Sequence, residues 1–138
     1  MSGADPPESG PLRVSIMSQG SYLIASIHTA LDDAHFERFQ RNLSDQIGQK
    51  RARGVIIDVA ALDVLDSFGS RTLRDLGQVA RLRGAETVVV GIQPEIAFAM
   101  VKFGINLEPI YTALDLEEGL ALLDRLGRSG AGSRQHTD

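Results

Sequence analysis

The apolar positions near the start of the chain are typical of two short strands. Leu12 to Met17 and Tyr22 to His28 are both rich in β-forming residues, and the polar segment Ser18 to Ser21 between them contains a glycine. Two such stretches joined by a short polar break predict a β-hairpin, which is an antiparallel pair of strands.

The next apolar positions follow a helical period. Large apolar side chains recur at i, i+3, i+7 and i+11, which places them on one face of a helix. These residues are Phe36, Phe39, Leu43 and Ile47. Asp32 and Asp33 precede them, where a carboxylate can cap a helix. Basic residues at 50–53 favour the end of this helix, and Gly54 is expected to release the chain from it.

Strand and helix patterns then alternate up to Leu126. The apolar run 55–59 is typical of a strand that is covered on both faces. The segments that follow are a helix at 67–83, a strand at 87–92, a helix at 94–104 and a short extended piece at Pro109–Tyr111. The last predicted element is a helix that Asp115 and Glu118 cap, with Leu116, Leu120 and Leu123 facing inward. This order predicts an α/β fold with a mixed, mostly parallel sheet, an N-terminal antiparallel hairpin strand and about four packed helices.

The length and the composition of the two ends define one domain. A chain of 138 residues is suited to a single core. Residues 1–11 and 127–138 are rich in Gly and Ser with little to bury, so both are expected to be disordered. The folded domain is therefore predicted to span residues 12–126.

Composition and motifs exclude several classes of function. The chain has no cysteine, and His28, His35 and His136 share no spacing typical of a metal site. No phosphate-binding glycine loop or nucleophile elbow is present, so neither a cofactor nor an enzymatic activity is expected. The net charge of −4 argues against nucleic-acid binding. Without a signal peptide or an apolar run of about 20 residues, no membrane association is expected, and the predicted location is cytoplasmic.

Ser67 is the residue that most favours a function. It opens the helix predicted at 67–83, where a serine can simply act as a cap. A phosphate at the same place would be stabilised by free backbone N–H groups and by the helix dipole. It would also lie close to Asp63 and Asp66, whose charges would repel it, although capping of the helix is by itself a sufficient explanation for these two carboxylates. Local stabilisation set against surface repulsion is what a binding switch requires, so both interpretations remain open at this point.

Two further charged features have a plain and a functional interpretation. Asp58 closes the strand at 55–59, at the edge of the sheet where ligands gather in α/β folds, although a hydrogen bond to the neighbouring loop would explain it. Four arginines lie in the helix at 67–83: Arg71, Arg74, Arg81 and Arg83. They fit a solvated helix face or a surface that docks an acidic partner.

The segment from Val55 to Gly69, VIIDVAALDVLDSFG, resembles the signature of STAS domains (sulfate transporter and anti-sigma factor antagonist). Such domains carry an apolar strand that ends in Asp, then an irregular loop, then Asp-Ser at the start of a helix. Within this family the chain is similar to the RsbS-type scaffolds of the bacterial stressosome. The shared marks are Leu31-Asp32-Asp33, Asp66-Ser67-Phe68, the segment 80–85, Gly91-Ile92-Gln93-Pro94 and the segment 112–117.

The resemblance implies a scaffold regulated by phosphorylation. It implies co-assembly with an RsbR-like STAS paralogue, capture of an RsbT-like serine/threonine kinase, release of that kinase on phosphorylation of Ser67, and resetting by an RsbX-like phosphatase. The helix at 94–104 has no Ser or Thr, which favours a single phosphorylation site. Ala60 departs from the Ser or Thr common in the family. The candidate partner-binding residues are Asp32, Asp58, Asp63, Asp66, Phe68 and Arg71.

Two alternatives remain within the same resemblance. A free anti-sigma factor antagonist of the SpoIIAA type would use the same serine in a small complex, although Phe68 replaces the serine common in that group. A STAS subunit of a membrane transport assembly would not need a phosphorylatable serine. The size of the protein in solution would separate the first alternative from a scaffold, and co-purification with membranes would identify the second.

Overall fold

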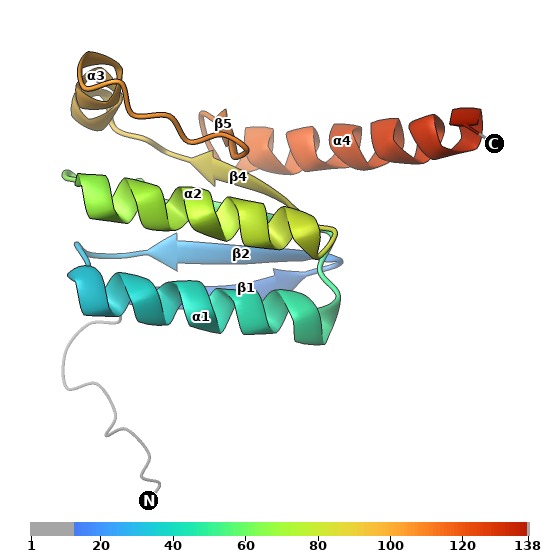
Figure 1. The fold of residues 1–138 in the computed structure, drawn as a ribbon, viewed down its shortest axis with the longest axis horizontal. Helices are drawn as coiled ribbons and strands as arrows, with labels where there is room; N and C mark the ends of the chain where they lie inside the picture. The colour runs from blue at the N-terminus through green and yellow to red at the C-terminus, as the bar shows by residue number, and fades with distance from the viewer. Residues whose placement is uncertain (1–12, 138) are drawn as a thin grey trace, which may run out of the picture.

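Strands and helices alternate along the chain in the computed structural model, which describes residues 13–137. Figure 1 shows the arrangement. The elements are β1 (Val14–Gln19), β2 (Tyr22–Ile27), α1 (Asp33–Lys50), β3 (Gly54–Asp58), α2 (Ser67–Leu82), β4 (Glu86–Val90), α3 (Pro94–Lys102), β5 (Tyr111–Ala113) and α4 (Leu116–Thr137).

The five strands form one mixed sheet in the order β1-β2-β3-β4-β5. β1 and β2 are antiparallel, from the pair Val14 and Ile27 to the pair Gln19 and Tyr22. The remaining neighbours are parallel, as helices return the chain between them. The predicted α/β fold with its N-terminal hairpin is therefore confirmed.

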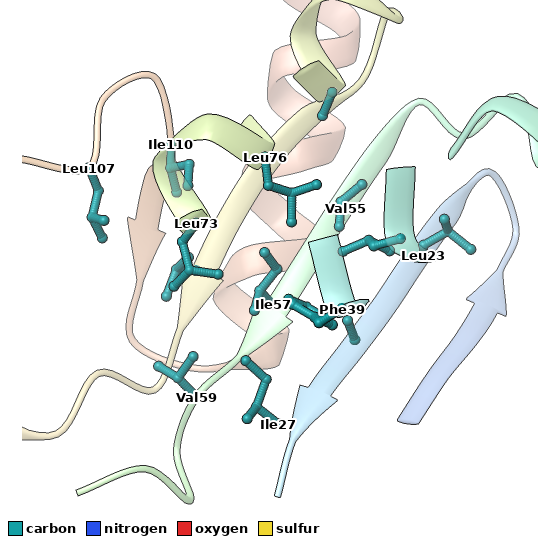
Figure 2. Packing of buried hydrophobic residues seen from close by; sticks show 14 of the residues in the cluster. Leu23, Ile27, Phe39, Val55, Ile57, Val59, Leu73, Leu76, Leu107 and Ile110 are labelled. Atoms are coloured by element: carbon teal, nitrogen blue, oxygen red, sulfur yellow. The ribbon is translucent and has the colours of Figure 1, made fainter. Parts of the chain in front are cut away.

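The sheet is covered on both faces. Along β3 the side chains alternate, so Val55 and Ile57 join the core beneath α1 and α2, whereas Ile56 joins a second core beneath α4. Figure 2 shows the first core, with α4 behind the sheet. Burial of β3 on both faces explains why its sequence is an uninterrupted apolar run.

The boundaries of α1 follow from its two ends. The four apolar residues predicted to share one face are all buried. Asp32 is the N-cap, and its Oδ1 accepts a hydrogen bond of 2.8 Å from the amide of His35. The helix ends at Arg51, which has a φ of 51°, so the expectation that Gly54 releases the chain was wrong. Gly54 begins β3 instead, and the lack of a side chain there leaves room for Leu123, since a Cβ would lie 2.8 Å from one of its methyl groups.

The C-terminal third differs from the prediction in two details. The extended piece predicted at Pro109–Tyr111 is instead the strand Tyr111–Ala113, because the amide of Ile110 forms a 2.8 Å turn hydrogen bond to the carbonyl of Leu107. Leu116 is 37% exposed and does not face inward, whereas Leu123 is buried at 3%. Leu120 is half-buried against the same core as Leu123.

α4 continues beyond the predicted end of the domain. The sequence places this end at Leu126, whereas the helix runs to Thr137. Extending an existing helix costs far less than starting one, which accounts for continuation past the packed part. The packed part is held by the buried Leu123 and by a 2.5 Å hydrogen bond from the Tyr22 hydroxyl to Asp124. Residues 1–12 and 138 lie outside the described residues, so the boundaries of the domain stay a prediction.

We expect removal of residues 129–138 to leave the melting temperature almost unchanged, because the leucines of α4 that pack against the sheet lie between residues 120 and 126. Removal of residues 1–10 should have as little effect.

By contrast, Leu123→Ala should lower the free energy of unfolding by about 2–5 kcal/mol, because it leaves a cavity at a packed position. Thermal and urea denaturation measure all three, and a loss on truncation as large as that of Leu123→Ala would show that a terminal segment docks on the domain.

Candidate functional site

The starts of α1 and α2 lie together at the carboxyl edge of the sheet. Each helix follows one of two neighbouring parallel strands, β2 and β3, so both amino termini are brought to the same edge. They are in close contact there, since a Cβ at Gly69 would lie 2.8 Å from the ring of Phe36. The edge is thus formed by two helix amino termini and by the loop of residues 59–66.

Asp66, and not Ser67, is the N-cap of α2. Its Oδ1 accepts a 2.8 Å hydrogen bond from the amide of Gly69, and its carbonyl accepts one of 2.9 Å from the amide of Ser70. The interpretation of Ser67 as a cap is therefore wrong, whereas capping by Asp66 is confirmed. Ser67 is the first residue of the helix, and its hydroxyl forms no hydrogen bond with the groups that the structure describes in residues 13–128.

The hydroxyl groups at the start of α2 differ sharply in exposure. Ser67 is exposed, whereas Ser70 is 3% exposed and Thr72 is 6% exposed. A kinase must bring the hydroxyl oxygen next to the γ-phosphate of ATP. Only Ser67 among these three offers its oxygen without unfolding of the helix.

The surroundings of Ser67 contain both attractive and repulsive groups. The amides of Ser67 and Phe68 have no acceptor within the described part of the chain, as expected for the first turn of a helix. They could donate to a phosphate at this position. Asp66 directly before Ser67 and Asp63 in the preceding loop are both exposed, and their charges would repel the phosphate.

The loop before Ser67 is fixed by hydrogen bonds and by one close contact. Asp58 is half-buried, and its Oδ1 accepts a 2.9 Å hydrogen bond from the amide of Ala60, so the predicted bond to the loop is confirmed. The side-chain amide of Gln93 donates to the carbonyl of Ala60 at 2.8 Å. A Cβ at Gly91, which has a φ of 82°, would lie 2.9 Å from that of Ala60. These contacts hold the loop against the segment that leads into α3.

The part played by Gly91 and Gln93 was missed by sequence reasoning. The sequence marks Gly91-Ile92-Gln93-Pro94 as part of the resemblance, and a glycine directly after a buried strand and shortly before Pro94 indicates a turn into a helix. That signal does not say which distant backbone the turn touches. Only the fold brings residue 93 to the carbonyl of residue 60.

Asp32 is engaged as a cap at the start of α1. It accepts hydrogen bonds from the amide of His35 at 2.8 Å and from the ring Nδ1 of His35 at 2.6 Å. These bonds, the amide first, lower the pKa of the Asp32 carboxyl below its usual value. The stabilising contribution is therefore complete above the ordinary pKa of an aspartate, about 3.9, and is lost as the pH falls through the lowered value. Sequence reasoning missed His35, whose spacing of three residues from a capping aspartate was the available signal.

The remaining candidate residues divide between the surface and the core. Arg71 is exposed one turn after Ser67, at the i, i+4 spacing that allows side chains to meet. Phe68 is half-buried and packs against the main core, so part of its role is structural. The structure therefore places Asp63, Asp66, Ser67 and Arg71 on the surface at the start of α2, with Asp32 at the start of the neighbouring helix.

Neither a metal-binding cluster nor a membrane-spanning helix occurs in the part of the chain that the structure describes. Among the side chains of residues 13–128, no group of three or more histidine, aspartate and glutamate residues is placed to hold a metal ion. Over the same part of the chain, no helix combines the length and apolar character that crossing a membrane requires.

Comparisons with known proteins agree on one family. The model of the STAS domain family matches residues 13–118. RsbT co-antagonist protein RsbRA of Bacillus subtilis (strain 168) is 30% identical over 90 residues, which are 65% of this chain and 33% of that protein. The chain thus spans about a third of the length of the curated relatives it matches.

Two solved structures share both the fold and a substantial part of the sequence. A serine-to-glutamate variant of RsbS from Moorella thermoacetica has a TM-score of 0.74 and 33% identity, and the match covers 85% of this chain and 99% of that one. A chain from a structure of the stressosome, described as a signal integration and transduction hub, has a TM-score of 0.66 and 31% identity. That match covers 83% of this chain and 99% of the other.

The assignment of the cap predicts unequal effects of two neighbouring substitutions. We expect Asp66→Ala to lower the free energy of unfolding by about 0.5–2 kcal/mol, because the amide of Gly69 loses its acceptor. Ser67→Ala should change that free energy by less than about 0.5 kcal/mol, since the side chain is exposed and unbonded. Urea denaturation measures both, and a larger loss for Ser67→Ala would contradict the assignment.

Proposed function

The chain belongs to the STAS domain family, and from this premise we propose that it is a non-enzymatic scaffold of a cytoplasmic stressosome. In this proposal the unmodified protein holds an RsbT-like serine/threonine kinase and releases it when Ser67 is phosphorylated. An RsbR-like STAS paralogue co-assembles with it, and an RsbX-like phosphatase resets Ser67. The similarity to RsbS and to a stressosome chain over almost their whole lengths supports the scaffold type.

One observation carries the choice of Ser67. It is exposed at the first position of α2, while the two nearest hydroxyls in the helix, those of Ser70 and Thr72, are buried. Because Asp66 performs the capping, the hydroxyl of Ser67 is free for modification. A phosphate can therefore be added without loss of the hydrogen bond that starts the helix.

The chemistry of the site explains how a phosphate would act. It brings a charge of about −2 to a surface that already carries Asp63 and Asp66. The amides at the start of α2 can bind the phosphate, and Arg71 is spaced to pair with it, so the fold tolerates the added charge. A kinase bound to the unmodified surface instead meets new negative charge in its interface. The proposed switch therefore changes recognition and leaves the domain folded.

We predict that Ser67→Ala abolishes phosphorylation by the cognate kinase and preserves binding of that kinase. The fold should remain intact, and the unmodified surface is the form that binds. Ser67→Asp should weaken retention of the kinase, although less than true phosphorylation, because a carboxylate carries half the charge. Mass spectrometry after incubation with kinase and ATP locates the phosphate, and co-elution measures retention.

Ser18→Asp is the matched control, because it adds the same charge at an exposed serine of β1. Retention of the kinase should be unchanged in this variant. Phosphate found on Ser70 or Thr72 with Ser67 unmodified would overturn the assignment.

A second prediction concerns assembly. Co-expression with an RsbR-like paralogue should yield a particle far larger than either protein alone, measured by size-exclusion chromatography with light scattering. This outcome separates a scaffold from a free anti-sigma factor antagonist, which would act as a small unit. Co-elution as no more than a one-to-one pair would favour the antagonist.

A further inference from the structure

Basic side chains gather where α1 and α2 end, at the edge of the sheet opposite Ser67. Figure 1 shows both helices ending on the same side of the molecule. The exposed basic residues at this edge are Lys50, Arg51, Arg53, Arg81 and Arg83. The net charge of the chain is −4, so this basic edge differs in sign from the chain as a whole.

A groove of about 530 Å³ lies between the ends of α1 and α2, and three arginines line it. These are Arg51, Arg53 and Arg83. Among residues 13–128, none of the three forms an ion pair with an acidic side chain. The nearby carboxylates are engaged elsewhere, since Glu86 pairs with Arg81 at 3.7 Å and Asp124 accepts a hydrogen bond from Tyr22. The three guanidinium groups are therefore available to a carboxylate from another molecule.

Arg51 occupies a backbone position that favours glycine. It ends α1 with a φ of 51° and a ψ of 47°, which is the left-handed conformation. Glycine is the usual residue there, because a Cβ is disfavoured in this conformation. The helix dipole does not require the arginine either, since Lys50 already places a positive charge in the last turn. A charged side chain that is kept at a strained position indicates a role in binding.

Gly48 gives the guanidinium of Arg83 its place in the groove. A Cβ at Gly48 would overlap the Nη2 atom of Arg83, so this side chain reaches from the end of α2 across the last turns of α1. A planar guanidinium binds a carboxylate through two parallel N–H···O bonds. Leu82, which is 89% exposed, lines the space between α2 and α1 as well and offers an apolar contact beside these charges.

We propose that this groove docks an acidic segment of a protein partner. Carboxylates of the segment pair with Arg51, Arg53 and Arg83, and an apolar side chain next to them covers Leu82. Nucleic acid fits less well, because the residues that line the groove include no aromatic ring on which a base could stack. The excess of acidic residues elsewhere in the chain would also repel an extended polyanion or an anionic membrane.

A labelled acidic peptide, Gly-Glu-Asp-Leu-Glu-Glu-Gly, tests the proposal with the full chain by fluorescence anisotropy. It should bind at least about tenfold more tightly than the same peptide with Gln and Asn in place of Glu and Asp. Arg53→Gln and Arg83→Gln should each raise the dissociation constant at least about threefold. The matched control is Arg41→Gln, which removes the same charge from α1 about 15 Å before Arg51 and should leave the constant unchanged.

Arg51→Gly gives the sharper test, because its two expected effects have opposite signs. It should raise the melting temperature, since glycine adopts the left-handed conformation without a steric cost. The same substitution should weaken binding of the acidic peptide at least about threefold. Ser67→Asp lies at the opposite edge and should leave binding of the peptide unchanged, so the docking groove and the proposed kinase switch are tested separately.

Several outcomes would overturn the proposal. They are equal affinity for the acidic and the neutral peptide, a loss in Arg41→Gln as large as that in Arg53→Gln, and unchanged binding by Arg51→Gly. Tighter binding of a short DNA duplex, or of vesicles that contain phosphatidylserine, would also overturn it. Either result would show that the basic edge serves another class of polyanion.

Discussion

The burial of β3 on both faces is the constraint on which the rest of the structure depends. Val55, Ile56 and Ile57 are completely buried at the centre of the five-stranded sheet. A strand enclosed in this way cannot shift its register, because a slip by one residue would exchange its two apolar cores. The position of Asp58, of the loop that follows and of the first turn of α2 is therefore set by packing far from the surface they form.

Two adjacent residues, Asp66 and Ser67, have separate roles at the start of α2. Asp66 supplies the capping oxygen, so the helix does not need the hydroxyl of Ser67. If Ser67 were the cap, a phosphate on it would have to replace a hydrogen bond that the fold uses. The arrangement instead separates the residue that stabilises the helix from the residue available for modification, and the burial of Ser70 and Thr72 leaves only one hydroxyl within reach.

Sequence reasoning succeeded where one residue or one period determines the outcome. The apolar residues of α1 follow the helical period, and all four are buried because nothing else competes for that face. It was wrong where neighbouring residues compete for a role, as with Asp66 and Ser67, since both side chains can cap and only the backbone geometry decides. The prediction for Leu116 was wrong for another reason. Leu116 continues an apolar pattern, yet in the first turn of α4 it is Gly119 that lies against Val90 of the sheet, whereas Leu116 is exposed.

Contacts between segments far apart in the chain could not be predicted from the sequence. One of them joins the segment before α3 to the loop before Ser67. Gln93, directly before the start of α3 at Pro94, donates a hydrogen bond to the carbonyl of Ala60. Ala60 lies after the end of β3, in the loop that leads to Ser67. Gly91 lets the two backbones approach, because any side chain there would meet Ala60. The start of α3 and the loop before Ser67 are thus held by the same few contacts at one edge of the sheet. Both segments leave the sheet from the ends of two adjacent parallel strands, β3 and β4, so the packing of these strands sets the position of both.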